Sequence, residues 1–103
     1  MKILLDEGVP KIIQWRLSKL SISNVEEMGW RGVKNGALLD LMSGRFQILI
    51  TTDKNLPSQQ NLEKRQIAVV ILPTNDIPSV IELLPKIERV VSDISPGEFK
   101  QLL

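Results

Sequence analysis

Two aspartates stand close behind short apolar stretches of the chain. Asp6 follows residues 2–5 directly, and Asp53 ends the stretch that begins at residue 46. Contiguous apolar runs are typical of buried strands in a parallel sheet, whose strand-to-helix loops all emerge at the carboxyl edge. If the two strands are neighbours, the carboxylates converge and repel each other unless a cation lies between them. The pair therefore indicates a divalent-metal site, although either aspartate alone could equally cap a helix or complete a turn.

The composition narrows the chemistry that such a site could perform. The chain contains no cysteine and no histidine. These absences exclude thiolate nucleophiles, His-dependent triads and zinc sites built from Cys. Carboxylates without His or Cys suit hard cations, so Mg²⁺ or Mn²⁺ is the expected cofactor. A net charge of +1 provides no global basic field, and it neither supports nor forbids an RNA substrate.

The length of 103 residues predicts one domain that spans residues 1–103. With 43% hydrophobic and 24% charged residues, the composition is typical of a soluble globular protein. The apolar run 67–72 is far shorter than the ~20 residues that a membrane helix needs, so no membrane contact is expected. An acid at position 6 also interrupts what would be the apolar part of a signal peptide, which predicts a cytoplasmic protein.

The apolar pattern predicts strands that alternate with helices. Strands are expected at residues 2–5, 22–25, 46–51 and 67–72, with a weaker edge strand within 96–103, and helices at 10–20, 35–43 and 80–91. Residues 54–65 are polar and are expected to form a loop with one or two helical turns. The alternation predicts an α/β fold of three layers, with a mainly parallel central sheet of about four to five strands and helices on both faces.

Four residues carry more specific expectations. Asn35 is a good N-cap for the helix that follows it, and Pro85 should kink or break the helix in which it stands. Trp15 should pack in or beside the core. Trp30, in a glycine-containing loop, could stack on a base, but anchoring that loop against the sheet is the favoured role.

Four consecutive segments resemble proteins of the PIN-like domain family, which includes toxin components and ribonucleases of toxin-antitoxin systems. The segments are LLDEGVP at 4–10, EEMGWRGVKNGALLDLM at 26–42, LITTDKNLPSQQNL at 49–62 and IAVVILPTND at 67–76. The resemblance implies metal-dependent cleavage of RNA, with Asp6 and Asp53 as catalytic acids that bind Mg²⁺ or Mn²⁺ directly. It also implies a role for Glu7 in orienting a ligand or water, a cognate antitoxin protein as partner, and a homodimer as an allowed state.

The chain departs from the family pattern at one acid. Relatives generally carry an acid near the start of the helix after the Gly-Trp loop, where this chain has Lys34, Asn35 and Gly36. Asn35 offers a neutral oxygen without the charge, and Asp40 lies about 140° further around the helix. A fourth acid would have to be Asp76. The sequence therefore leaves open whether the chain cleaves RNA.

Polar side chains near Asp53 are candidates for substrate binding. They can donate hydrogen bonds to phosphates or base edges of single-stranded RNA, or they can simply be a solvated surface loop. The candidates are Asn35, Lys54, Asn55, Gln59 and Gln60.

Two other functions remain open. A degenerate PIN-like module could bind RNA or a protein partner without cleaving, which the missing acid favours. A receiver-like regulatory domain would use Asp6 and Glu7 as its acidic pair and Asp53 as phosphate acceptor. It ranks last, because residues 73–79 contain no lysine after the last expected buried strand.

Overall fold

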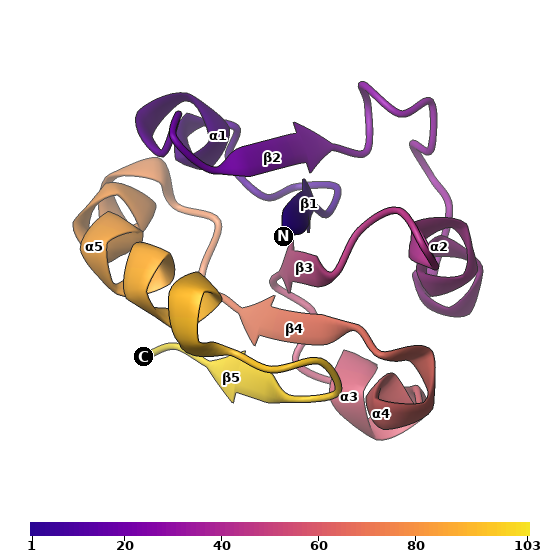
Figure 1. Cartoon of the computed structure of the whole chain (residues 1–103). Helices are drawn as coiled ribbons and strands as arrows, with labels where there is room; N and C mark the ends of the chain where they lie inside the picture. The colour runs from indigo at the N-terminus through magenta and orange to yellow at the C-terminus, as the bar shows by residue number, and fades with distance from the viewer.

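The computed structural model describes all residues from Met1 to Leu103 and contains one five-stranded sheet between two layers of helices (Figure 1). Every pair of neighbouring strands is parallel. This confirms the predicted α/β fold with a parallel sheet. In spatial order the strands are β2 (Ser21–Asn24), β1 (Lys2–Leu5), β3 (Ile48–Thr51), β4 (Ala68–Ile71) and β5 (Phe99–Gln101).

Helices cover both faces of the sheet. One layer consists of α1 (Ile12–Arg16) and α5 (Ile77–Asp93), and the other of α2 (Asn35–Met42), α3 (Leu56–Gln59) and α4 (Leu62–Arg65). Figure 1 shows these two groups on opposite sides of the strands. No helix has the length and apolar character that crossing a membrane would require.

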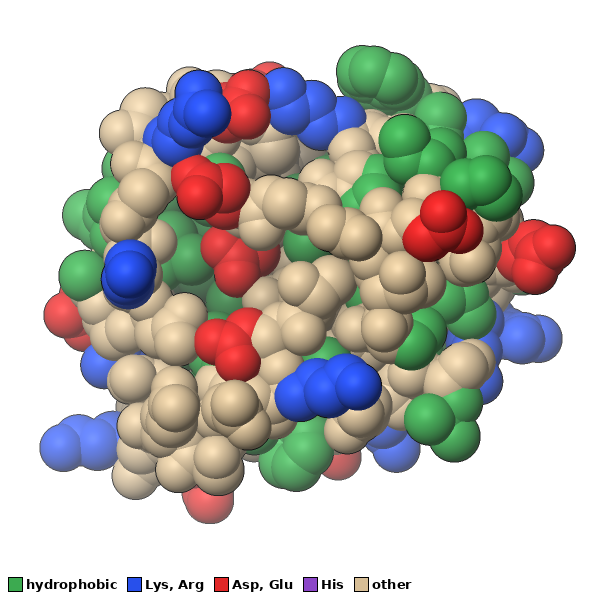
Figure 2. Space-filling view, turned by 180° about the vertical axis from the view of Figure 1, so that it is seen from behind, with side chains coloured by type: hydrophobic (Ala, Val, Ile, Leu, Met, Phe, Trp, Pro, Cys, Tyr) green, Lys and Arg blue, Asp and Glu red, His purple; other side chains and the backbone are tan.

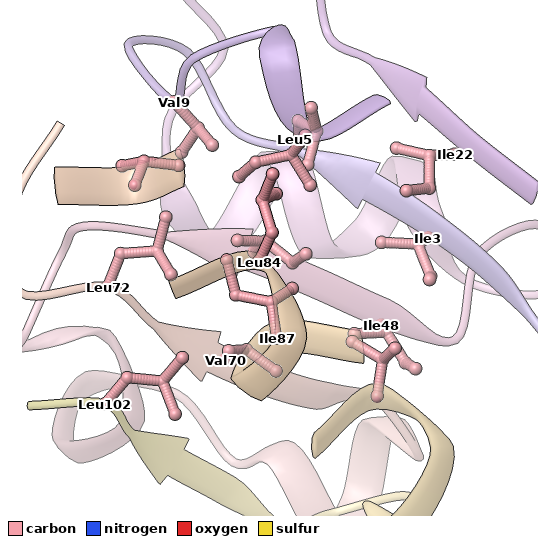
Figure 3. Packing of buried hydrophobic residues seen from close by; sticks show 14 of the residues in the cluster. Ile3, Leu5, Val9, Ile22, Ile48, Val70, Leu72, Leu84, Ile87 and Leu102 are labelled. Carbon is pink, nitrogen blue, oxygen red and sulfur yellow. The ribbon is translucent and has the colours of Figure 1, made fainter. Parts of the chain in front are cut away.

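Successive strand residues point to opposite faces, which explains why the strands read as unbroken apolar runs. Ile3 and Leu5 of β1 belong to a cluster of 16 buried residues under α1 and α5, whereas Leu4 belongs to a cluster of 12 under the other layer. Figure 3 shows Leu84 and Ile87 of α5 packing over the first of these clusters. Both faces of the sheet are therefore buried.

The sheet order creates a switch point between β1 and β3. From β1 the chain continues to α1 in one layer, and from β3 it continues to α3 in the other. Loops that leave neighbouring parallel strands toward opposite faces open a crevice at the carboxyl edge, where ligands bind in open α/β sheets. Asp6 and Asp53 both follow these two strands.

Three local predictions differ from the structure, the third in part. The first helix is shorter than residues 10–20, because α1 ends at Arg16. Trp15 is 68% exposed, since Ile13 takes the core-facing position and Trp15 lies about 200° around the helix from it. The expected break at Pro85 is absent, and α5 continues through it. Proline has no N–H, so the carbonyl four residues before it loses its helical hydrogen bond. Because Pro85 lies on the exposed face of α5, water can bind that carbonyl instead and the helix can continue.

Candidate functional site

The ends of β1 and β3 bring Asp6 and Asp53 to the same carboxyl edge of the sheet. Because the two strands are hydrogen-bonded neighbours, the condition on which the predicted pair depended is met. The Asp6 N–H donates to the Ile50 carbonyl at 2.9 Å, so the pairing with β3 extends to the aspartate itself. The β1–β3 register therefore holds the Asp6 backbone in place.

The surroundings of Asp6 disfavour its ionised form. Burial raises the pKa of Asp6 above its ordinary range, and the charges of Asp53 and Glu7 act in the same direction. Hydrogen bonds from the Thr51 hydroxyl and from the Glu7 N–H lower it, but they do not cancel the rise. When Asp6 is ionised, two negative carboxylates lie near each other with no positive group to balance them. A bound cation would reduce this repulsion.

Thr51 connects the two acidic segments, and the sequence analysis did not include it among the site residues. Its hydroxyl donates to Asp6 Oδ2 at 2.7 Å, and its oxygen accepts from the Asp53 N–H at 3.1 Å. The side chain is 1% exposed and is, with Asn24, one of two buried polar residues in the chain. The sequence feature that could have identified Thr51 as a site residue is its place at the end of an apolar strand, two positions before Asp53.

Asp53 is held by two donors from different elements. The Asn55 N–H donates to Oδ1 and the Asn35 side-chain amide donates to Oδ2, each at 2.9 Å. Asn35 is the first residue of α2, and Lys34 occupies the N-cap position without a side-chain cap. The prediction that Asn35 caps this helix is therefore wrong. Its amide reaches across to the acid instead, with the nitrogen and not the oxygen against the carboxylate.

Glu7 contacts the neighbouring loop in the structure. Its exposed carboxylate accepts a hydrogen bond from the Gly32 N–H at 2.9 Å. Gly32 has a φ of +82°, a conformation that glycine adopts at low cost. Glu7 therefore links the loop after β1 to the loop after β2, and its side chain makes no hydrogen bond with either aspartate.

Of the other polar candidates, some lie beside Asp53 and others contact different parts of the chain. Gln59 Oε1 lies 3.4 Å from Asn35 Nδ2, so it reaches the same amide that contacts Asp53. The side chain of Gln60 packs against Gly36 and also accepts from Arg65 at 3.4 Å. Lys54 is exposed and makes no side-chain hydrogen bond or ion pair. Asn55 contacts Asp53 through its backbone N–H and not through its side chain.

The remaining candidate acids have structural contacts elsewhere. Asp76 caps α5 by accepting from the Ser79 N–H at 3.2 Å and from its hydroxyl at 2.7 Å. Asp40 pairs with Arg65 at 2.5 Å. The chain contains no group of three or more acidic side chains arranged to hold a metal. The site therefore offers two carboxylates, a number that suits Mg²⁺, which commonly takes one or two and completes its shell with water and phosphate oxygens.

Trp30 anchors its loop as the favoured interpretation predicted. Its ring packs edge-on against Phe46 at a centroid distance of 5.9 Å, and the Arg45 guanidinium lies 5.1 Å from its centroid. The side chain is half-buried against the cluster under α2. Its packing on the core and on Arg45 fixes the loop that precedes α2.

Comparisons of the chain with protein-family models, with curated proteins and with solved structures found no match. The resemblance to PIN-like proteins stays a prediction that depends on the four sequence segments. The fold and the contacts of Asp6 and Asp53 stand independently of it.

Proposed function

We propose that the chain is a Mg²⁺- or Mn²⁺-dependent endoribonuclease of the PIN-like kind. The observation that supports this proposal most directly is the pair Asp6 and Asp53 at the switch point between β1 and β3. Their shared position favours a ligand that carries positive charge, since burial and Asp53 together raise the pKa of Asp6. The sequence resemblance supplies the reaction type and the RNA substrate.

In this proposal Asp6 and Asp53 hold the metal ion. A bound divalent ion activates water and stabilises charge that develops on phosphate oxygens. Thr51 fixes the orientation of the Asp6 carboxylate, and the Asn55 N–H does the same for Asp53. Both carboxylates are thus restrained before any ligand arrives, which reduces the ordering that binding would require.

Polar groups beside the pair would contact the RNA. Lys54 follows Asp53 and is free of intramolecular partners, so its ammonium group is available to a phosphate. Asn35 and Gln59 place side-chain amides next to Asp53 and could read base edges or the 2′-hydroxyl. An amide oxygen of Asn35 would face a metal only after the amide group rotates by half a turn, because its nitrogen faces Asp53 now.

Calorimetric titration with Mn²⁺ tests the metal site. The native chain should bind Mn²⁺, and both Asp6→Asn and Asp53→Asn should weaken binding by at least about tenfold, because each removes a charged ligand. Asp93→Asn is the matched control, since it removes one exposed carboxylate at the far end of α5. Failure of the native chain to bind Mn²⁺ at millimolar concentration would contradict the proposal.

Cleavage of a labelled single-stranded RNA tests the activity. It should require Mg²⁺ or Mn²⁺ and should disappear in Asp53→Asn but not in Asp93→Asn. The role of toxin held by a cognate antitoxin protein depends on the resemblance alone. Expression of the native chain should then arrest growth, and Asp53→Asn should relieve that arrest.

A module that binds RNA or a protein partner without cleaving is the second candidate. The specific observation in its favour is the Asn35 amide, which donates to Asp53 at the place where the family pattern has an acid. An amide donor satisfies the Asp53 carboxylate without any metal. RNA binding with equal affinity in Mg²⁺ and in a chelator, without cleavage in either, would favour this candidate over the ribonuclease.

A further inference from the structure

An apolar surface remains exposed over α1 and the beginning of α5. Trp15 is 68% exposed and Ile77 is 54% exposed. Ile12 and Ile81 are half-buried on the same two helices. Figure 2 shows hydrophobic side chains gathered at the upper right, over these helices. Contiguous apolar surface of this kind marks interaction sites more often than isolated exposed residues do.

A shallow groove of about 240 Å³ runs between the two helices. Its floor is apolar and comes from Leu17, Ile81, Leu84 and Pro85. A cation on α1 and an anion on α5 complete its lining. These charged residues are Arg16 and Glu88.

Neither charged residue has an ion-pair partner within the chain. The ion pairs in the structure are Lys11 with Glu26 and Arg65 with Asp40. Arg16 and Glu88 are both exposed at the groove. The groove therefore presents one unpaired positive and one unpaired negative group around an apolar centre.

We propose that this face binds a second copy of the chain across a two-fold axis. In such an interface the same patch serves both copies, so residue i of one meets residue j of the other and the reverse. Arg16 of each copy would lie against Glu88 of the other, which forms two equivalent ion pairs from one groove. The charge pattern is complementary to itself, which favours a second copy over a uniformly acidic or basic partner.

Trp15, the neighbour of Arg16 on α1, would become buried beside the groove in this contact. Tryptophan is among the side chains that contribute most to interfaces when it becomes fully buried. Ile13 occupies the core-facing position of α1, so the Trp15 ring points outward and is available for a contact outside the chain. This proposal concerns a different face from the carboxyl edge that carries Asp6 and Asp53, and it does not depend on the proposed ribonuclease activity.

The edge strand β5 offers a less suitable surface for a second copy. Phe99 is 53% exposed there, but β5 has only three residues. In a two-fold antiparallel pairing centred on the strand, Lys100 would lie opposite itself, and like charges directly opposite each other destabilise a sheet. Phe99 therefore serves as the matched exposed aromatic in the test.

Sedimentation equilibrium of charge-reversed variants at low ionic strength tests the interface. Arg16→Glu and Glu88→Arg should each raise the dimer dissociation constant by at least about tenfold, because each places like charges at both contacts. A 1:1 mixture of the two variants should dimerise again, since one then presents two anions and the other two cations. Restoration by mixing cannot arise from a contact within one chain.

Trp15→Ser should weaken the dimer, whereas Phe99→Ser should leave it unchanged. Circular dichroism and thermal unfolding of each variant check that it is folded; if Trp15→Ser does not fold, the charge-reversed pair still decides the question. A native chain that stays monomeric at about 1 mM, a concentration at which a specific contact of millimolar affinity would be half formed, overturns the proposal. So does a mixture that fails to dimerise, or a dimer that only Phe99→Ser disrupts.

Discussion

The Thr51 hydroxyl donates to Asp6 Oδ2 at 2.7 Å and so joins the end of β3 to the end of β1. The same oxygen accepts from the Asp53 N–H at 3.1 Å. One buried hydroxyl thus orients both acidic segments of the candidate site. The contact exists only because β1 and β3 are neighbours in the sheet.

Thr51→Val should destabilise the chain by about 1–3 kcal/mol, because valine has a similar shape but leaves the Asp6 carboxylate and the Asp53 N–H without this partner. Urea unfolding measures the loss. Thr52→Val is the matched control, since Thr52 is half-buried and makes no side-chain hydrogen bond in the structure. Equal stability changes in the two variants would contradict the assigned role of Thr51.

Asp6 should make the metal-free chain less stable as the pH rises. Burial raises its native pKa above the unfolded value, so the native state binds this proton more tightly. The contribution of Asp6 to the free energy of unfolding is therefore largest below the unfolded pKa. This contribution falls as the pH rises from the unfolded pKa through the raised native pKa. At pH values above the native pKa it stays constant at its lowest level.

Two measurements check this pH dependence. The Asp6 carboxyl carbon should titrate above the ordinary aspartate range by NMR, and saturating Mg²⁺ should move its midpoint down. Unfolding in urea at a series of pH values should show a smaller decline in Asp6→Asn. Glu26 acts in the opposite direction, because its hydrogen bond to Lys11 lowers its pKa, but its side chain is 47% exposed and its effect on stability should be small.

Asn35→Asp should strengthen Mn²⁺ binding by about tenfold, because it adds a third carboxylate beside Asp53. The same change should destabilise the metal-free chain, since it replaces an amide donor with a like charge. Calorimetry and urea unfolding measure the two effects. Asn75→Asp is the control, because Asn75 is exposed, makes no side-chain hydrogen bond and gains the same charge. Unchanged Mn²⁺ affinity in Asn35→Asp would place the metal elsewhere.

Gly97→Ala should destabilise the chain more than Gly44→Ala does. Both glycines have positive φ, +89° and +76°, which costs an alanine about 1 kcal/mol. At Gly97 the added Cβ would also lie 2.9 Å from the Cα of Glu63, whereas nothing lies within 4 Å at Gly44. Thermal unfolding compares the two variants. Similar losses would show that α4 moves away from Gly97 at little cost.

Much of the fold was predictable because buried positions recur at regular spacings, which makes the apolar residues of the sequence periodic. The contiguous apolar runs at β3 and β4 report burial on both faces of a sheet. The spacing of Val80, Leu84, Ile87 and Val91 reports one buried face of α5. Such patterns depend on neighbours along the chain, so the parallel sheet and its two helical layers followed from them.

Predictions about single side chains were less successful where several environments fit one residue type. Trp15 is a large apolar residue and was expected near the core, but its angular position on a short α1 directs it outward. Asn35 suits an N-cap as well as a contact with a carboxylate. The choice between these depended on where α2 lies relative to the loop after β3.

The sequence by itself determined the class of fold, the absence of thiol and imidazole chemistry, and the positions of Asp6 and Asp53 behind two buried strands. Only the tertiary structure decided that these strands are adjacent, that Thr51 links the two acids, and that Arg16 and Glu88 line one groove. The physical reason is the range of the interactions. Periodic burial is encoded locally, whereas strand order and helix packing bring together residues that lie far apart in the chain.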